Sequence, residues 1–152
     1  MDELILSVVD QSPVRSDGTA KDALNETVDL AIAAESLGYR RYWVAEHHNL
    51  ANFAGTSPEI MVGQIASRTN TIRVGSGGVM LPHYSALKVA ENFRMLETLF
   101  PGRIDLGIGR APGSDQITAA ALAYPRVPID INHYPQQVKD VMSFLGDTHA
   151  NE

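Results

Sequence analysis

Hydrophobic and polar residues alternate along the chain in blocks that predict four strands, each followed by a helix. Apolar runs bounded by turn residues are typical of buried strands, in which β-branched and aromatic residues are common. The runs expected to form strands are residues 4–9, 41–45, 72–74 continuing into 75–78, and 103–106. Because strands and helices alternate, the pattern predicts an α/β fold with a parallel sheet and helices outside it.

Helical spacing and capping residues mark the segments between these strands. Leu24, Val28 and Ala31 recur on one face of the first helix. Thr19 is its expected N-cap and Gly38 its C-terminal stop. Further helices are expected over residues 57–68, 85–100 and 135–145, with one helical turn at 118–122 inside a proline-containing excursion. We expect residues 1–145 to form one folded unit and residues 146–152 a polar tail.

Composition and charge narrow the class of protein. The chain has 152 residues, of which 44% are hydrophobic and 20% charged, as in globular domains. Its formal net charge is -6 and it has no run of Lys or Arg, so a nucleic-acid or anionic-membrane partner has no electrostatic support. Cysteine is absent, which excludes disulfides and thiolate chemistry. The acidic N-terminus and the lack of an apolar run of about 20 residues predict a cytoplasmic protein without a signal peptide or membrane span.

The two ends of the predicted strands differ in chemistry. The strands are entered through short, ordinary turns that contain Gly38, Asn70 and Gly102. They are left through polar or glycine-rich segments, namely residues 10–12, 46–48, 75–78 and 107–113. In a parallel sheet these four exits lie on one side, which is the side that carries the active site in α/β folds. The sequence therefore predicts an active face at the carboxyl ends of the strands.

Glu46, His47 and His48 follow the second strand and are the first candidates for chemistry. Adjacent strand residues point to opposite faces, so one imidazole faces the active side and a metal site using both is disfavoured. That histidine can act as a general acid or base near neutral pH, or be a hydrogen-bonded strand-end residue without a catalytic role. Glu46 can orient a histidine, bind a polar ligand, or form a structural ion pair with an arginine.

Two glycine-rich exits are the next candidates. Around Ser76-Gly77-Gly78 the missing side chains let a planar group approach the backbone, although a bulge or tight bend would use the glycines equally well. The run lacks the pattern of a phosphate-binding glycine loop. Arg110, in the fourth exit, suits a phosphate or carboxylate. An ion pair of Arg110 with Asp105 or Asp115 is the structural alternative.

Four motifs in register resemble the luciferase-like flavin-dependent monooxygenase family, which includes the bacterial luciferases and alkanal-monooxygenase-like oxidoreductases. The matching stretches are residues 42–48, 74–82, 90–103 and 105–113. The likeness extends over nearly the whole chain, to about residue 145. Because it combines four motifs, it is more specific than the Glu-His-His sequence alone.

The resemblance implies a (β/α)8 barrel that binds reduced FMN, or in some branches a deazaflavin, at the carboxyl face of its strands. It implies that the enzyme uses O2 to oxidise an aldehyde or another small organic substrate. By resemblance His47 is the catalytic histidine, Arg110 helps to hold the cofactor phosphate, and a non-prolyl cis peptide lies within Ser76-Gly77-Gly78. The residues expected to contact the cofactor are Glu46, Ser76, Gly77, Gly78 and Arg110.

A complete barrel of this type needs about 250 residues, so the four units are expected to be its N-terminal half. The alternatives are a flavin-binding protein without turnover and an inactive fragment that assembles through its exposed half-barrel face. A half-barrel leaves two sheet edges and one sheet face uncovered, so we expect a homo-oligomer. The residues expected on the uncovered face are Leu4, Leu6, Trp43, Val74 and Ile104 or their neighbours. A separate flavin reductase is a further candidate partner.

Overall fold

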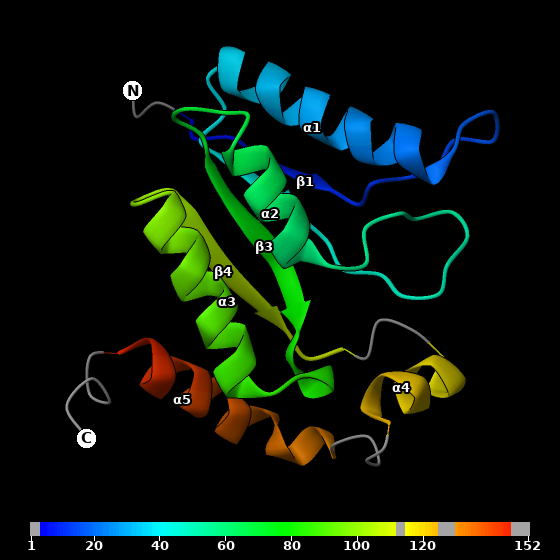
Figure 1. Cartoon of the computed structure of the whole chain (residues 1–152), viewed down its shortest axis with the longest axis vertical. Coiled ribbons are helices and arrows are strands. Elements are labelled where there is room, and N and C mark those ends of the chain that lie inside the picture. The colour runs from blue at the N-terminus through cyan, green and yellow to red at the C-terminus, as the bar shows by residue number, and fades with distance from the viewer. Residues whose placement is uncertain (1–3, 112–114, 125–129, 147–152) are drawn as a thin grey trace.

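The computed structural model describes residues 4–111, 115–124 and 130–146. One parallel sheet is formed, in this order, by β1 (Ser7–Asp10), β2 (Arg41–Val44), β3 (Arg73–Met80) and β4 (Ile104–Gly109). The strands are connected by α1 (Ala20–Ser36), α2 (Pro58–Ala66) and α3 (Ala86–Leu99). These three helices lie over the same face of the sheet (Figure 1). The fold is therefore α/β with four consecutive strand–helix units, about half of a (β/α)8 barrel, as the sequence predicts.

Two further helices follow β4. They are α4 (Gln116–Ala123) and α5 (Tyr134–Leu145), and α5 is preceded by the short 3-10 turn η2 (Ile131–His133). α5 packs against α3 and against a second 3-10 turn, η1 (Leu81–His83). α4 is longer than the single predicted turn because the side chain of Asp115 caps it, accepting a hydrogen bond from the Thr118 backbone at 2.8 Å. Apart from Gly146, the predicted polar tail lies outside the described residues. Within the described residues, no helix combines the length and apolar character needed to cross a bilayer.

Strand boundaries differ from the predictions where pairing with a neighbour decides them. β1 begins at Ser7, which pairs with Arg41 at the start of β2, so the apolar residues 4–6 precede the ladder. β3 continues through the glycine segment to Met80, which pairs with Gly109. The register between β3 and β4 shifts between Ser76 and Val79. The predicted third exit is therefore the interior of an irregular strand, and its predicted cis peptide is confirmed between Gly77 and Gly78.

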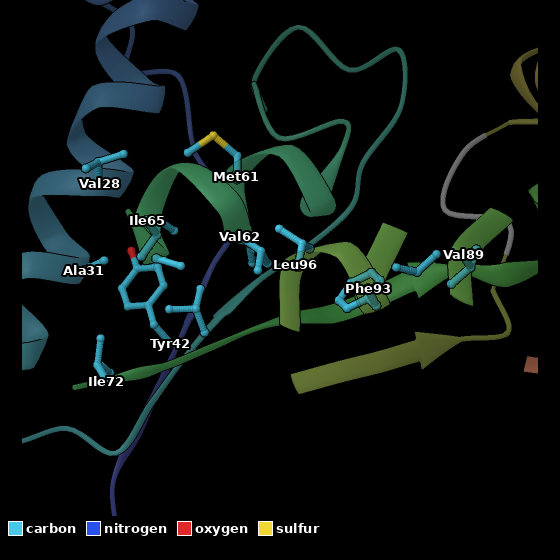
Figure 2. Packing of buried hydrophobic residues seen from close by; sticks show 14 of the residues in the cluster. Val28, Ala31, Tyr42, Met61, Val62, Ile65, Ile72, Val89, Phe93 and Leu96 are labelled. Atoms are coloured by element: carbon cyan, nitrogen blue, oxygen red, sulfur yellow. The ribbon is translucent and has the colours of Figure 1, made fainter. Parts of the chain in front are cut away.

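The hydrophobic core lies between the sheet and the helices. Tyr42 and Val74 are fully buried, and Figure 2 shows Tyr42 among side chains that converge from the surrounding helices. Ile104 packs partly buried against the same cluster. The prediction that Val74 and Ile104 lie on the uncovered face is thus wrong, because side chains alternate along a strand and theirs point towards the helices.

The face of the sheet turned away from the helices, here called the open face, carries the alternate residues. These are Ser7, Val9, Arg41, Trp43, Arg73, Gly75, Gly77, Asp105 and Gly107. A Cβ at Gly75 would lie 2.7 Å from Cζ3 of Trp43, so the absent side chain gives the indole its space. Asp105 forms ion pairs with Arg73 at 2.6 Å and with Arg41 at 3.1 Å. The open face is therefore more polar than the expected apolar patch, although Val9 remains 64% exposed.

Candidate active site

A hollow of about 260 Å³, here called the strand-end hollow, opens at the carboxyl ends of the strands. It is lined by Val9, Gln11, Ala45, Glu46, His47, Gly77, Gly78, Met80, Gly109 and Ala111. All four strands or the residues that follow them contribute, as the sequence predicts. A larger hollow of about 430 Å³ lies at the amino ends, beside residues 4–6 and 37–40, and is remote from these groups.

His47 lines this hollow, and one nitrogen of its ring lacks a partner within the described part of the chain. Its Nδ1 is buried and has no hydrogen-bond partner among the described residues. The imidazole stacks on the ring of Phe53, with centroids 4.6 Å apart and an interplanar angle of 22°. The backbone N–H of His47 donates to the carbonyl of Gly55 at 2.9 Å. Loop residues 53–55 thus fix both the ring and the backbone, while the catalytic role of His47 stays a prediction.

Glu46 lies beside His47 in sequence, but its side chain is fully buried. Its carboxylate accepts hydrogen bonds from Tyr84 Oη at 2.7 Å and the Met80 backbone N–H at 2.9 Å, and shares a third with His48 Nε2 at 2.6 Å. Burial and the hydrogen bond to Glu46 raise the pKa of the Tyr84 phenol. Glu46 therefore orients a histidine, as one interpretation of the sequence expects, and that histidine is His48. Its role as a cofactor contact stays a prediction.

The glycine segment forms a wall of the hollow from backbone alone. Gly77 is exposed, and a Cβ there would lie 3.0 Å from the Cβ of Trp43. A Cβ on Gly78 would lie 2.9 Å from the backbone of Gly107. Ser76 is buried, and its hydroxyl bridges to β4 by donating to the Gly107 carbonyl at 2.8 Å. The two glycines thus offer backbone to a ligand, while the Ser76 hydroxyl is used within the sheet.

Arg110 follows β4 directly and is exposed, and its neighbours Gly109 and Ala111 line the hollow. Among the described residues its guanidinium has no ion-pair or hydrogen-bond partner. Asp105, one of the two predicted partners, is engaged by Arg41 and Arg73. Arg110 itself is not among the residues that line the hollow, and its role in binding a phosphate stays a prediction.

The first strand exit has a structural role. The buried carboxylate of Asp10 accepts from Tyr42 Oη at 2.7 Å and from the Ser12 backbone at 2.8 Å. Sequence reasoning did not single out Phe53 or Tyr84, which are the partners of His47 and Glu46. Both lie outside the strands, where no periodic pattern marks them.

Comparisons with known proteins bear directly on this arrangement. A family profile described as luciferase-like monooxygenase matches residues 4–139. The chain belongs to this family. A Bacillus subtilis protein named YwcH is 57% identical over 142 residues, which is 93% of this chain and 42% of that protein. N-acetyl-S-alkylcysteine monooxygenase of the same organism is 48% identical over 143 residues, with 93% and 42% covered. The chain spans less than half the length of these relatives.

Solved structures of larger proteins contain the same arrangement of elements. The crystal structure of apo-MsnO8 has a TM-score of 0.91 and 43% identity, over 99% of this chain and 45% of that chain. The oxygenating constituent of 3,6-diketocamphane monooxygenase from Pseudomonas putida, in complex with FMN, has a TM-score of 0.71 and 20% identity, with 93% and 37% covered. An F420-dependent secondary alcohol dehydrogenase has a TM-score of 0.65 and 18% identity, with 92% and 40% covered. At such low identities the last two show the fold alone.

Proposed function

We propose that the chain provides the cofactor-facing half of an FMN-dependent monooxygenase that acts on a small organic substrate. The observation that carries the proposal is the position of His47 in a hollow lined by Gly77 and Gly78, with a buried Nδ1 that no described residue pairs with. Family membership supports the reaction class. The FMN complex of the diketocamphane monooxygenase constituent supports the choice of FMN, whereas the F420-dependent neighbour keeps a deazaflavin as the second candidate.

The residues present fit a flat aromatic cofactor with a phosphate. Gly77 and Gly78 line the hollow without side chains, so a ring could lie against their backbone there. Packing within the sheet also requires glycine at both positions, since a Cβ on either would collide with Trp43 or Gly107. Arg110, without a partner among the described residues, would neutralise the phosphate. When bound, reduced FMN supplies the electrons that activate O2. A separate flavin reductase would deliver it in reduced form.

The remaining chemistry falls to residues of the chain. His47 would donate or accept a proton at Nδ1, and the Phe53 ring would keep its imidazole in place. The other walls that exclude water would come from the second half of a barrel, because the relatives are more than twice as long as the matched region. The oxidised substrate would be an aldehyde or another small organic molecule that fits the completed hollow.

The test joins this chain to the part of YwcH that it does not match, and measures FMN binding and reductase-coupled O2 consumption separately. We expect His47→Ala to lower substrate-dependent turnover by roughly 10²–10⁴, the usual contribution of a general acid–base group, with little change in FMN affinity. The matched control is His133→Ala, because His133 is an exposed histidine in η2 outside the hollow. Unchanged turnover in His47→Ala would contradict the proposed role. FMN binding without substrate-dependent O2 consumption would instead support a flavin-binding protein without turnover.

A further inference from the structure

We propose that Glu46 is the positioning residue of the strand-end hollow, because it fastens the wall that carries His47 to the wall formed by Gly77 and Gly78. The first wall follows the end of β2, and the second lies within β3. The effect of Glu46 on a reaction rests on the proposed function, whereas the hydrogen-bonded link between the two walls is a property of this chain. Nothing about a bound cofactor is needed to test it.

The contacts of Glu46 cross from one wall to the other. Its backbone continues directly into His47, while its carboxylate accepts the N–H of Met80, two residues after Gly78, at 2.9 Å. The ladder between β2 and β3 ends at the pair Val44 and Ser76, so this hydrogen bond extends the connection beyond the ladder, on the side where His47 and the glycine segment lie. Tyr84, which follows η1, donates its hydroxyl to the same carboxylate at 2.7 Å, so Glu46 also contacts the end of η1.

A carboxylate meets the demands of this position better than any uncharged side chain of its size. Each carboxylate oxygen accepts from a donor of the protein: Oε2 from the Met80 N–H and Oε1 from the Tyr84 hydroxyl. Nε2 of His48 lies 2.6 Å from Oε1 as well, so both oxygens are needed as acceptors. A glutamine would turn an NH2 group towards at least one of these donors, which would leave a buried polar group without a partner.

The burial of Glu46 separates this role from that of a cofactor contact. Although residue 46 is among those that line the strand-end hollow, its side chain is 0% exposed and its carboxylate is surrounded by three groups of the protein. Proton transfer and ring placement depend on the distance between His47 and a ligand that lies against Gly77 and Gly78. A misplacement of about 1 Å in such a geometry can cost on the order of 10²-fold in rate. A residue that fixes both walls can therefore control the reaction without touching the reacting atoms.

The experiment uses the 152-residue chain itself, labelled with 15N, and compares Glu46→Gln with Glu35→Gln by NMR. Glu35 is the matched control, because its carboxylate also accepts backbone N–H groups, from residues 70–72, which are outside the hollow. For Glu46→Gln we expect the amide signals of His47, Gly77 and Gly78 to shift together with that of Met80. The Met80 amide should exchange with solvent about tenfold faster than in wild type after correction for global stability, the loss expected of one charge-assisted hydrogen bond.

Two results would overturn the proposal. In the first, Glu46→Gln changes Met80 while His47 and both glycines keep their wild-type signals, which would make Glu46 a local acceptor only. In the second, Glu35→Gln moves the same four signals, which would make the response a global one. If Glu46→Gln fails to fold, Tyr84→Phe removes a single donor and keeps the carboxylate, and the proposal is overturned if the signals of His47, Gly77 and Gly78 all stay at their wild-type positions in this variant. Failure of the oxygen-consumption assay would count against the proposed function alone, since these signals are read without flavin.

Discussion

The Glu35 carboxylate fastens the carboxyl end of α1 to the segment that leads into β3, and we predict that this contact makes stability depend on pH. Its Oε1 accepts the backbone N–H groups of Asn70, Thr71 and Ile72 at 2.9, 2.6 and 2.9 Å. Glu35→Gln mimics the protonated carboxyl. We expect the substitution to lower the free energy of unfolding at pH 7 and to lose this effect in acid.

The magnitude follows from the pKa of Glu35. Partial burial acts to raise this pKa, but the backbone N–H groups of residues 70–72 outweigh burial and lower it from 4.5 to about 2. A difference of this size between the unfolded and folded states corresponds to at most roughly 3 kcal/mol. Because Glu35 is only partly buried, solvent screening reduces the expected loss to about 1–2 kcal/mol. Since the folded-state pKa is the lower one, the stabilisation is complete above pH 4.5 and disappears as the pH falls towards about 2.

The assay is urea unfolding followed by far-UV circular dichroism at pH 7 and at about pH 2.5. Glu91→Gln is the control, because Glu91 is exposed on α3 and only 3.5 Å from Lys88, an arrangement expected to contribute less than about 1 kcal/mol. Equal midpoints for wild type and Glu35→Gln at pH 7 would refute the reasoning. The reasoning would also be refuted if the midpoints of wild type and Glu35→Gln differed as much at pH 2.5 as at pH 7.

Three further predictions concern the isolated chain. FMN should bind to it only weakly, because a phosphate at a barrel mouth draws on loops after the seventh and eighth strands; a submicromolar Kd from fluorescence quenching would contradict this. Gly107→Ala should lower the free energy of unfolding by about 1–3 kcal/mol, because its Cβ would lie 2.2 Å from the Ser76 carbonyl oxygen. Gly109→Ala, with its nearest neighbour at 3.7 Å, is the control, and an equal effect of the two in urea unfolding would refute the packing argument. Light scattering behind size exclusion should show an oligomer, since both sheet edges are unpaired, and a folded monomer at tens of micromolar would refute this.

The type and order of the elements can be predicted from the sequence because each depends on local signals. α1 starts after Thr19, whose side chain and that of Asp22 form a complete capping box. Gly38, just beyond this helix, adopts a positive φ of 80°, as its position after the helix predicts. Boundaries that depend on a distant partner are the ones predicted wrongly, such as the start of β1 opposite Arg41.

The strand ends that line the candidate site can be predicted from the sequence, whereas the residues that hold its side chains in place cannot. The four strand exits converge because parallel strands share one carboxyl edge, which a sequence can reveal. Which of His47 and His48 faces the hollow depends on which face of β2 the helices cover, and Tyr42 decides that by entering the core. The stacking of Phe53 on His47 joins two positions in an irregular loop, where no spacing rule applies.

The ion cluster on the open face also bears on how copies of the chain can associate. Arg41 and Arg73 share the single carboxylate of Asp105, so these three residues together carry one net positive charge, which the nearby Glu97 offsets in part. Two copies that pack open face against open face would bring two such charges together, a repulsion that dissolved salt screens. Association through the sheet edges would keep the clusters apart and depend on backbone hydrogen bonds. Raising the ionic strength should therefore strengthen the first kind of dimer and leave the second nearly unchanged.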